Sequence, residues 1–243
     1  MAPTSPPIHS SAGVRLVAGD QPGLSRVEVL NGEEQFNLPW DRFMRLRTTA
    51  DHLRRVVGPD RRLRVLDVGG FDGAIAMFAP AHQFDLIDPA TTDGSGLSIP
   101  VADRSYDAVV CVDVIEHVAA KERAPLLFEL ARVAGEFCFI NFPNRATMPA
   151  QKLVLSLTND MYVREHVELE LPEKAWVIDQ MTALGFECLA IPNASLALWA
   201  AQFTLQRLAP EAAAQVSRYL VETHREEPFS VPLYFLVICT RKT

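Results

Sequence analysis

Val65-Leu66-Asp67-Val68-Gly69-Gly70-Phe71-Asp72-Gly73 is the stretch that decides the fold of this 243-residue chain. An apolar run ends in an acid and then breaks into a glycine-rich turn. Continuous apolar residues before such a turn are typical of a buried strand in a parallel sheet. Glycines let a backbone pass close to a ligand because they carry no Cβ atom. The stretch therefore predicts a strand followed by a ligand-binding turn.

Two further segments follow at informative distances. Residues 84–88 form a short apolar run ending in Asp88, which lies 21 positions after Asp67 and precedes Pro89. In nucleoside-binding α/β folds, an acid about 20 residues beyond the glycine turn ends the next strand and binds ribose hydroxyls. Residues 105–118 form another apolar run that leads into polar residues, among them Asp113. The order of the three segments indicates a nucleoside-binding α/β protein.

The three segments together resemble those of the class I S-adenosylmethionine (SAM) methyltransferases, of the bacterial small-molecule type. The resemblance covers about residues 63–144. It implies a Rossmann-like, seven-stranded, mostly parallel sheet with helices on both faces and an antiparallel last strand. It also implies an enzyme that moves a methyl group from SAM to a small-molecule acceptor, with a hydroxyl oxygen as the expected acceptor atom.

The resemblance also implies which residues surround the cofactor. They are Asp67, Gly69, Gly70, Phe71, Gly73, Asp88, Pro89 and Asp113. Two departures favour an alternative, a non-catalytic binding or partner subunit with the same fold. Phe71 stands where the family usually carries its middle glycine, and only eleven residues separate Asp88 from Pro100, too few for the usual helix and third strand. An NAD-dependent oxidoreductase is disfavoured because its glycine spacing is absent from residues 69–73.

Two histidines are candidate catalytic residues. His117 follows the segment with Asp113, and His166 lies where the family builds its acceptor pocket. Histidine suits a general base because its ordinary pKa is close to neutral. The alternative for each is a structural role that shapes the pocket. No metal site is predicted, and the four cysteines are expected to be buried thiols rather than disulfide or zinc partners.

The composition of the chain limits the kinds of partner that it is expected to bind. Hydrophobic residues make up 49% of the chain, charged residues 22%, and the net charge is −7. Nucleic acid is disfavoured because no basic stripe is present to bind phosphates. The expected acceptor is a small molecule such as a sugar, a phenol or a lipid-like compound. With neither a signal peptide nor a membrane-spanning run, the expectation is a cytoplasmic protein without stable membrane insertion.

The chain divides into a tail and one domain. Residues 1–12, rich in Pro and Ser, are expected to be disordered, and residues 13–243 to form a single methyltransferase domain. Residues 37–58 predict a helical cover, capped by Asn37, whose arginine-rich face is solvated. Residues 194–228 predict a helical insert before the last strand. The insert packs against the sheet or a homodimer partner, or it forms a lid over an apolar substrate.

Overall fold

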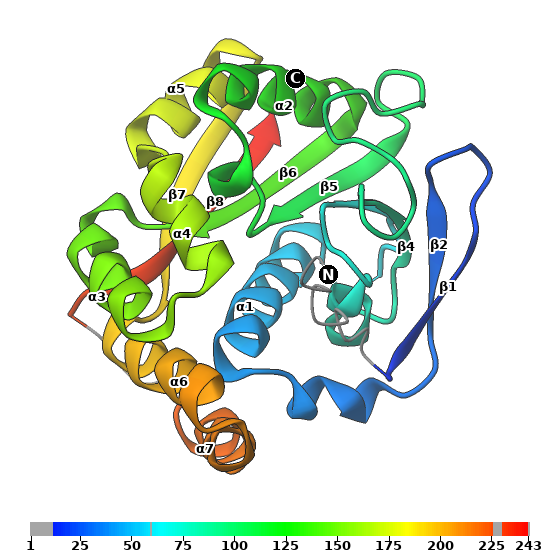
Figure 1. Ribbon diagram of the computed structural model, residues 1–243. Coiled ribbons are helices and arrows are strands. Elements are labelled where there is room, and N and C mark those ends of the chain that lie inside the picture. The colour runs from blue at the N-terminus through cyan, green and yellow to red at the C-terminus, as the bar shows by residue number, and fades with distance from the viewer. Residues whose placement is uncertain (1–11, 59, 226–229, 243) are drawn as a thin grey trace, which may run out of the picture.

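The computed structural model describes residues 12–58, 60–225 and 230–242, so the expected disordered tail lies almost wholly outside the described residues. One sheet runs through the molecule in the order β1-β2-β4-β3-β5-β6-β8-β7 (Figure 1). Its strands are β1 (Val14–Ala18), β2 (Ser25–Val29), β3 (Arg64–Val68), β4 (Gln83–Ile87), β5 (Tyr106–Val112), β6 (Ala134–Pro143), β7 (Phe186–Ser195) and β8 (Pro232–Arg241).

The centre of the sheet is parallel, as predicted. Strand β3 pairs in parallel with β4 and β5, and β5 pairs in parallel with β6. Strand β8 runs antiparallel to both β6 and β7, which confirms the expected direction of the last strand.

The sheet has eight strands in place of the seven predicted. An N-terminal hairpin, β1–β2, supplies two strands at the edge beside β4, and β2 pairs antiparallel with β4. The segment between Asp88 and Pro100 contains no strand of its own. It is too short for a helix and a parallel strand, so the hairpin covers the edge that such a strand would otherwise cover.

Helices cover both faces of the sheet, as predicted (Figure 1). Helices α2 and α5 lie on one face, and α1, α6 and α7 lie on the other. The α-helices are α1 (Trp40–Val57), α2 (Ala120–Val133), α3 (Met148–Thr158), α4 (Met161–Glu168), α5 (Lys174–Ala183), α6 (Leu196–Leu208) and α7 (Pro210–Thr223). The 3-10 helices are η1 (Gly32–Asn37), η2 (Ala74–Phe78), η3 (Ile115–His117) and η4 (Arg145–Thr147).

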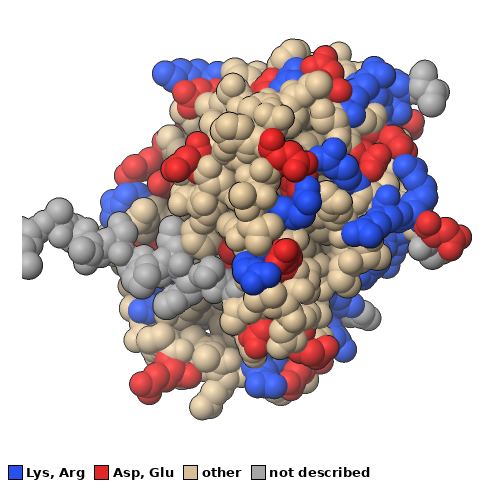
Figure 2. Space-filling view, turned by 90° about the vertical axis from the view of Figure 1, so that its right-hand side faces the viewer, with Lys and Arg blue, Asp and Glu red and all other residues tan. Residues whose placement is uncertain are grey.

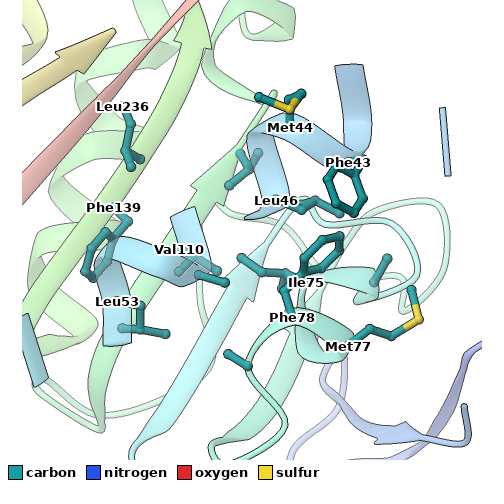
Figure 3. Packing of buried hydrophobic residues seen from close by; sticks show 14 of the residues in the cluster. Phe43, Met44, Leu46, Leu53, Ile75, Met77, Phe78, Val110, Phe139 and Leu236 are labelled. Atoms are coloured by element: carbon teal, nitrogen blue, oxygen red, sulfur yellow. The ribbon is translucent and has the colours of Figure 1, made fainter. Parts of the chain in front are cut away.

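Two apolar clusters form the core, one on each side of the sheet. In the first, Phe43 and Leu53 of α1 pack with Phe78 and with strand residues that include Val110 (Figure 3). In the second, α2 and α5 pack on the opposite face, which includes Val109. Neighbouring residues of β5 thus belong to different clusters because side chains alternate between the faces of a strand. The central strands are therefore buried on both sides.

The start of the cover helix differs from the prediction. Asn37 does not cap it but ends η1, a 3-10 helix that Asn31 caps by accepting a hydrogen bond from the Glu33 amide at 3.1 Å. Helix α1 begins only at Trp40, because Pro39 has an extended ψ of 141°. The hairpin, η1, α3 and α4 were not predicted.

The cysteines also differ in part from the expectation. Cys111 and Cys138 are free and buried, as expected. Cys188 and Cys239 are instead joined in a disulfide between β7 and β8. The strand register places these two residues directly opposite each other, with Cα atoms 4.2 Å apart. Register between distant strands is not a local property of the sequence, so the pairing was missed.

None of the helices in the described part of the chain is long and apolar enough to span a bilayer. Figure 2 shows that basic and acidic side chains are intermingled on the face that lies to the right in Figure 1. A phosphate backbone is bound by clustered positive charge, so this face offers no such footprint among its described residues.

A buried carboxylate joins the hairpin to the central strands. Asp85 of β4 accepts hydrogen bonds from the Tyr106 hydroxyl at 3.0 Å and from Arg64 Nη2 at 3.2 Å. Its other oxygen lies 3.5 Å from Arg26 Nε of β2. Asp85 therefore connects β2, β3 and β5 through its side chain.

We expect Asp85→Ala to lower the free energy of unfolding by about 1–3 kcal/mol, because it removes a charged acceptor from three donors. Urea unfolding followed by circular dichroism measures the change. Tyr106→Phe should cost less, since it removes one donor and leaves both arginines paired. The exposed Asp179→Ala is the control and should leave stability unchanged. Equal stability of Asp85→Ala and the wild type would refute this role for Asp85.

Candidate functional site

A cavity of about 780 Å³ opens at the carboxyl ends of β3, β4, β5 and β6. The residues after these strands form its floor, and α1, α4 and α6 form its walls. Parallel α/β sheets place their ligands at this edge because the loops there converge on one crevice. The cavity holds all the predicted site residues except Gly73.

The glycine turn packs so closely against its neighbours that side chains would not fit. A Cβ atom on Gly70 would lie 1.9 Å from Asp67 Oδ2, and one on Gly69 would lie 2.5 Å from Val114 Cγ2. Gly69 also has a φ of 77°, which favours glycine. Gly73 has a φ of 73°, and a Cβ there would meet Val27 of β2 rather than the cavity. The structure therefore places Gly73 against the hairpin, away from the cavity lining.

Phe71 lies on the cavity wall in a left-handed conformation, with a φ of 59°. Such a conformation costs a residue with a side chain about 1–3 kcal/mol and persists only where its surroundings hold it. The Phe71 amide donates to Asp88 Oδ2 at 3.1 Å, and its carbonyl accepts from Thr91 Oγ1 at 2.6 Å. These two bonds fix a backbone shape that the family's glycine would adopt without strain.

Asp88 organises the shortened loop that follows β4. Its Oδ1 accepts from the Ala90 amide at 2.8 Å, and its own amide donates to Thr92 Oγ1 at 2.9 Å. Thr92 Oγ1 also lies 2.8 Å from the Gly23 carbonyl oxygen of the hairpin. Pro89 lines the cavity beside Asp88. The hairpin thus braces the loop.

Asp67 lies beneath the turn and is almost fully buried, with 2% of its surface exposed. Burial, reinforced by the nearby charges of Asp72 and Asp88, raises the pKa of Asp67 to about 8. The charge of Arg42 acts in the opposite direction but is the smallest of these effects. Arg42 of α1 pairs with Asp72 Oδ1 at 2.6 Å. A buried acid of this kind stabilises a cationic group placed beside it.

Arg45 connects the cover helix to the sheet. Its guanidinium lies 2.8 Å from Asp41 Oδ2, 3.0 Å from Asp113 Oδ2 and 3.2 Å from the Tyr234 hydroxyl. The expected solvated arginine face is therefore wrong for Arg42 and Arg45, which line the cavity. Both lie on the side of α1 that faces the sheet, where Asp72 and Asp113 supply their counter-charges.

Asp113 sits where β5 ends, with a φ of 65°. Burial acts to raise the pKa of Asp113, but Arg45, His117 and His166 outweigh it, so the pKa is lowered. Glu116 is fully buried, and burial together with the charge of Asp113 raises its pKa well above the usual range. One carboxylate is thus kept ionised and its neighbour is kept neutral.

The two predicted histidines, His117 and His166, lie next to each other. His117 Nε2 lies 3.3 Å from His166 Nε2. On the outer sides, His117 Nδ1 lies 2.7 Å from Glu165 Oε2, and His166 Nδ1 lies 3.3 Å from Gln151 Oε1. Burial and the neighbouring His117 lower the pKa of His166 to about 4, so the His166 ring is neutral near pH 7.

Several cavity residues were not predicted. They are Arg45 of α1, Gln151 of α3, Tyr162 and Glu165 of α4, Trp199, Phe203, Gln206 and Arg207 of α6, and Tyr234 of β8. The helical insert therefore contributes a wall of the cavity through α6. The apolar run in this insert was the sequence feature that indicated a possible role at the substrate. Helix α3 carries no motif, so nothing in its sequence indicated Gln151, whereas Glu165 of α4 directly precedes the predicted His166.

These residues fit the cofactor that the resemblance implies. Gly69 and Gly70 line the cavity with backbone alone, Asp67 suits an ammonium group, and Asp88 offers a carboxylate to paired hydroxyls. SAM carries each of these groups, in its methionine and ribose parts.

Comparison with known proteins finds one family model that matches part of the chain. A family model described as "Methyltransferase domain" matches residues 62–136, which include the glycine turn, Asp88 and the η3 histidine. No curated protein matches the chain.

Several solved structures are similar at low identity. Magnesium protoporphyrin IX methyltransferase from Synechocystis PCC 6803, with bound S-adenosylhomocysteine, is 12% identical, with a TM-score of 0.49 over 88% of this chain and 90% of that chain. An O-methyltransferase family protein from Burkholderia thailandensis is 14% identical, with a TM-score of 0.47 over 82% and 57%. The YcgJ protein from Bacillus subtilis is 12% identical, with a TM-score of 0.46 over 81% and 99%.

The glycine turn, the acid that ends β4 and the η3 segment thus lie within one matched region and around one cavity. This region, which spans less than a third of the chain, is similar to the methyltransferase-domain family.

Proposed function

We propose that this enzyme transfers a methyl group from SAM to a hydroxyl oxygen of a small-molecule acceptor. The observation that carries the proposal is a single cavity with two chemically different ends. One end has the glycine turn with Asp67 and Asp88, and the other has the facing pair His117 and His166. When bound, SAM supplies a methyl group on a sulfonium centre, which is already activated for transfer.

The first end would hold the cofactor. The backbone of Gly69 and Gly70 can approach it closely, since no side chain intervenes. Asp67 would pair with its ammonium group, and Asp88 would accept from its ribose hydroxyls. Phe71 and Pro89, both on the cavity wall, would pack beside it.

The second end would hold the acceptor. Its walls include the aromatic side chains of Tyr162, Trp199 and Phe203, which suit a sugar ring, a phenol or a lipid-like group. The charge of Arg45 is already balanced by Asp41 and Asp113, which favours a neutral acceptor. Alignment of an acceptor with an activated group can lower a barrier by about 7–11 kcal/mol, so these walls would supply much of the catalysis.

His117 and His166 would act on the acceptor hydroxyl. Both histidines line the cavity, His117 partly exposed and His166 buried. Their Nε2 atoms face each other, so the pair would handle the hydroxyl proton as a unit. His117 stands nearer to the acceptor, and Glu165 holds its ring in place from the other side.

The first test is calorimetric titration with SAM and with S-adenosylhomocysteine. We expect one site per chain, and a loss of more than about tenfold in affinity for Asp88→Ala, since hydrogen bonds to a charged group contribute about 1.5–3 kcal/mol. The control Asp179→Ala removes an exposed acid on α5 and should bind as the wild type does. A folded wild type that binds neither compound would reject the proposal and support the non-catalytic alternative.

A second prediction concerns the number of protons released when SAM binds. The free protein holds Asp67 protonated below about pH 8, and an ammonium group beside it would lower that pKa. SAM binding at pH 7 should therefore release about one proton, and binding at pH 9.5 should release almost none. Titrations in buffers of different ionisation enthalpy measure the release. The same release by Asp67→Asn at pH 7 would show that another group is responsible.

A third prediction concerns the turn. Gly70→Ala places a methyl group on the Asp67 carboxylate, so we expect SAM affinity to fall by more than about tenfold, with a stability cost of about 1–3 kcal/mol. Gly32→Ala is the matched control, because its Cβ would meet only the Met77 carbonyl oxygen at 3.9 Å. Titration and urea unfolding of both variants test the prediction. Unchanged SAM binding by Gly70→Ala would contradict it.

A further inference from the structure

Beside the acceptor end of the cavity, three side chains from two separate segments bring ligand atoms together. Glu116 and His117 come from η3, and His166 comes from α4. One ligand atom from each of the three side chains lies within 4.8 Å of the other two. The Nε2 atoms of the two histidines lie 3.3 Å apart.

The hydrogen bonds around His166 show which of its nitrogens carries the proton. Thr147 donates its hydroxyl proton to the Asn144 carbonyl at 2.6 Å, so the Thr147 oxygen accepts from Gln151 Nε2 at 3.5 Å. This orients the Gln151 amide with Oε1 toward His166 Nδ1. An amide oxygen only accepts, so Nδ1 of His166 carries the hydrogen and Nε2 presents a lone pair.

The same holds for His117. Its Nδ1 faces the Glu165 carboxylate at 2.7 Å, and an ionised carboxylate only accepts. His117 Nε2 therefore also presents a lone pair when the ring is neutral. Two lone pairs that face each other at 3.3 Å repel unless a positive centre lies between or beside them. Histidine ligands of metals show this pattern, with the outer nitrogen bonded to a carboxylate or an amide and the inner nitrogen bound to the metal.

The carboxylates beside the histidines have few hydrogen-bond partners. Apart from each other, the oxygens of the fully buried Glu116 and Asp113 Oδ1 have no hydrogen-bond partner among the described residues. A buried polar atom without a partner is costly and therefore uncommon. Asp113 also interacts electrostatically with His117 and His166. A divalent cation would satisfy the carboxylate oxygens and both imidazoles at once.

A single buried arginine holds the two ligand-bearing segments in place. Arg123 Nε donates to the carbonyls of Ile115 and Val118, at 3.1 and 3.0 Å, on either side of the η3 ligands. Its Nη2 donates to the carbonyls of Leu169 and Glu170, at 3.0 and 2.5 Å, just beyond α4. Rigid support of this kind is what a coordination site requires.

We propose that Glu116, His117 and His166, assisted by Asp113, form a binding site for a divalent transition-metal cation next to the acceptor. Imidazole nitrogens with carboxylate oxygens suit Zn²⁺, Co²⁺ or Mn²⁺ better than Mg²⁺ or Ca²⁺, which prefer oxygen alone. Three protein ligands leave a position open to an oxygen of water or of the acceptor. The inference deepens the function proposed above, on which its catalytic meaning rests. With the cation bound, the Nε2 atoms of both histidines are ligands, so the cation, in place of the histidine pair, would orient and polarise the acceptor hydroxyl.

The test is direct metal binding by the full chain, without SAM or acceptor. After treatment with a chelator and its removal, the protein is titrated with Co²⁺, whose visible absorption reports nitrogen coordination, and with Zn²⁺, Mn²⁺ and Mg²⁺ by calorimetry. We expect one Co²⁺ or Zn²⁺ per chain and much weaker binding of Mg²⁺. Absence of stoichiometric binding of Co²⁺, Zn²⁺ and Mn²⁺ by the folded chain would overturn the proposal.

Variants locate the site. Glu116→Gln and His166→Gln should each weaken Co²⁺ binding by more than about tenfold and alter its spectrum. His52→Gln, on α1, removes a histidine that bonds only to its own helix in the described contacts and serves as the matched control. Circular dichroism confirms that each variant is folded. Unchanged Co²⁺ binding by both Glu116→Gln and His166→Gln would place the cation elsewhere and refute the site.

Titration with SAM of the metal-free and metal-loaded protein separates the two proposals. SAM binding by a chain that takes up no transition metal would reject the metal site alone. Metal binding at the named residues by a chain that never binds SAM would support the metal site and reject the methyltransferase function.

Discussion

The cavity depends on one buried guanidinium. Arg45 extends from the cover helix and pairs with Asp41 of the same helix, with Asp113 at the end of β5 and with Tyr234 of β8. It thereby fixes the distance between α1 and the carboxyl edge of the sheet. It also keeps Asp113 ionised, which in turn helps to keep Glu116 neutral. The shape of the cavity and the protonation of its polar end thus follow from the same ion pairs.

Much of the fold was predictable because its signals are local. The apolar run within residues 105–118 contains strand β5, the insert predicted over residues 194–228 contains α6 and α7, and the cover helix predicted over residues 37–58 ends at Val57. The hairpin β1–β2 was not predictable in the same way. Its strands are short, and what stabilises them is pairing with β4, about 60 residues further along the chain. The Cys188–Cys239 disulfide has the same cause, since only the register of β7 against β8 brings the two residues together.

The site residues also differ in whether a local sequence pattern predicts them. Asp67, Asp88 and Asp113 follow strands, so the topology of a parallel sheet predicts that they meet. The sequence also indicated both histidines, although not that they would face each other. Arg45 and Gln151 come from helices without a motif, and their roles arise only from tertiary contacts. Glu165 precedes the predicted His166, but its contact with His117 also depends on how α4 packs. Local patterns thus predicted the residues at the strand ends, while the groups that tune and orient them depend on how the helices pack.

Strand β8 has a consequence for how the protein is made. It lies between β6 and β7, and β7 pairs with no other described strand. During synthesis, which proceeds from the N-terminus, β7 and the helices α6 and α7 emerge before their place in the sheet can exist. The last described strand, β8, must then insert between β6 and β7 and pair with both of them. Until that moment β6 and β7 expose unpaired backbone, so the nascent chain is most prone to aggregate just before its synthesis reaches β8.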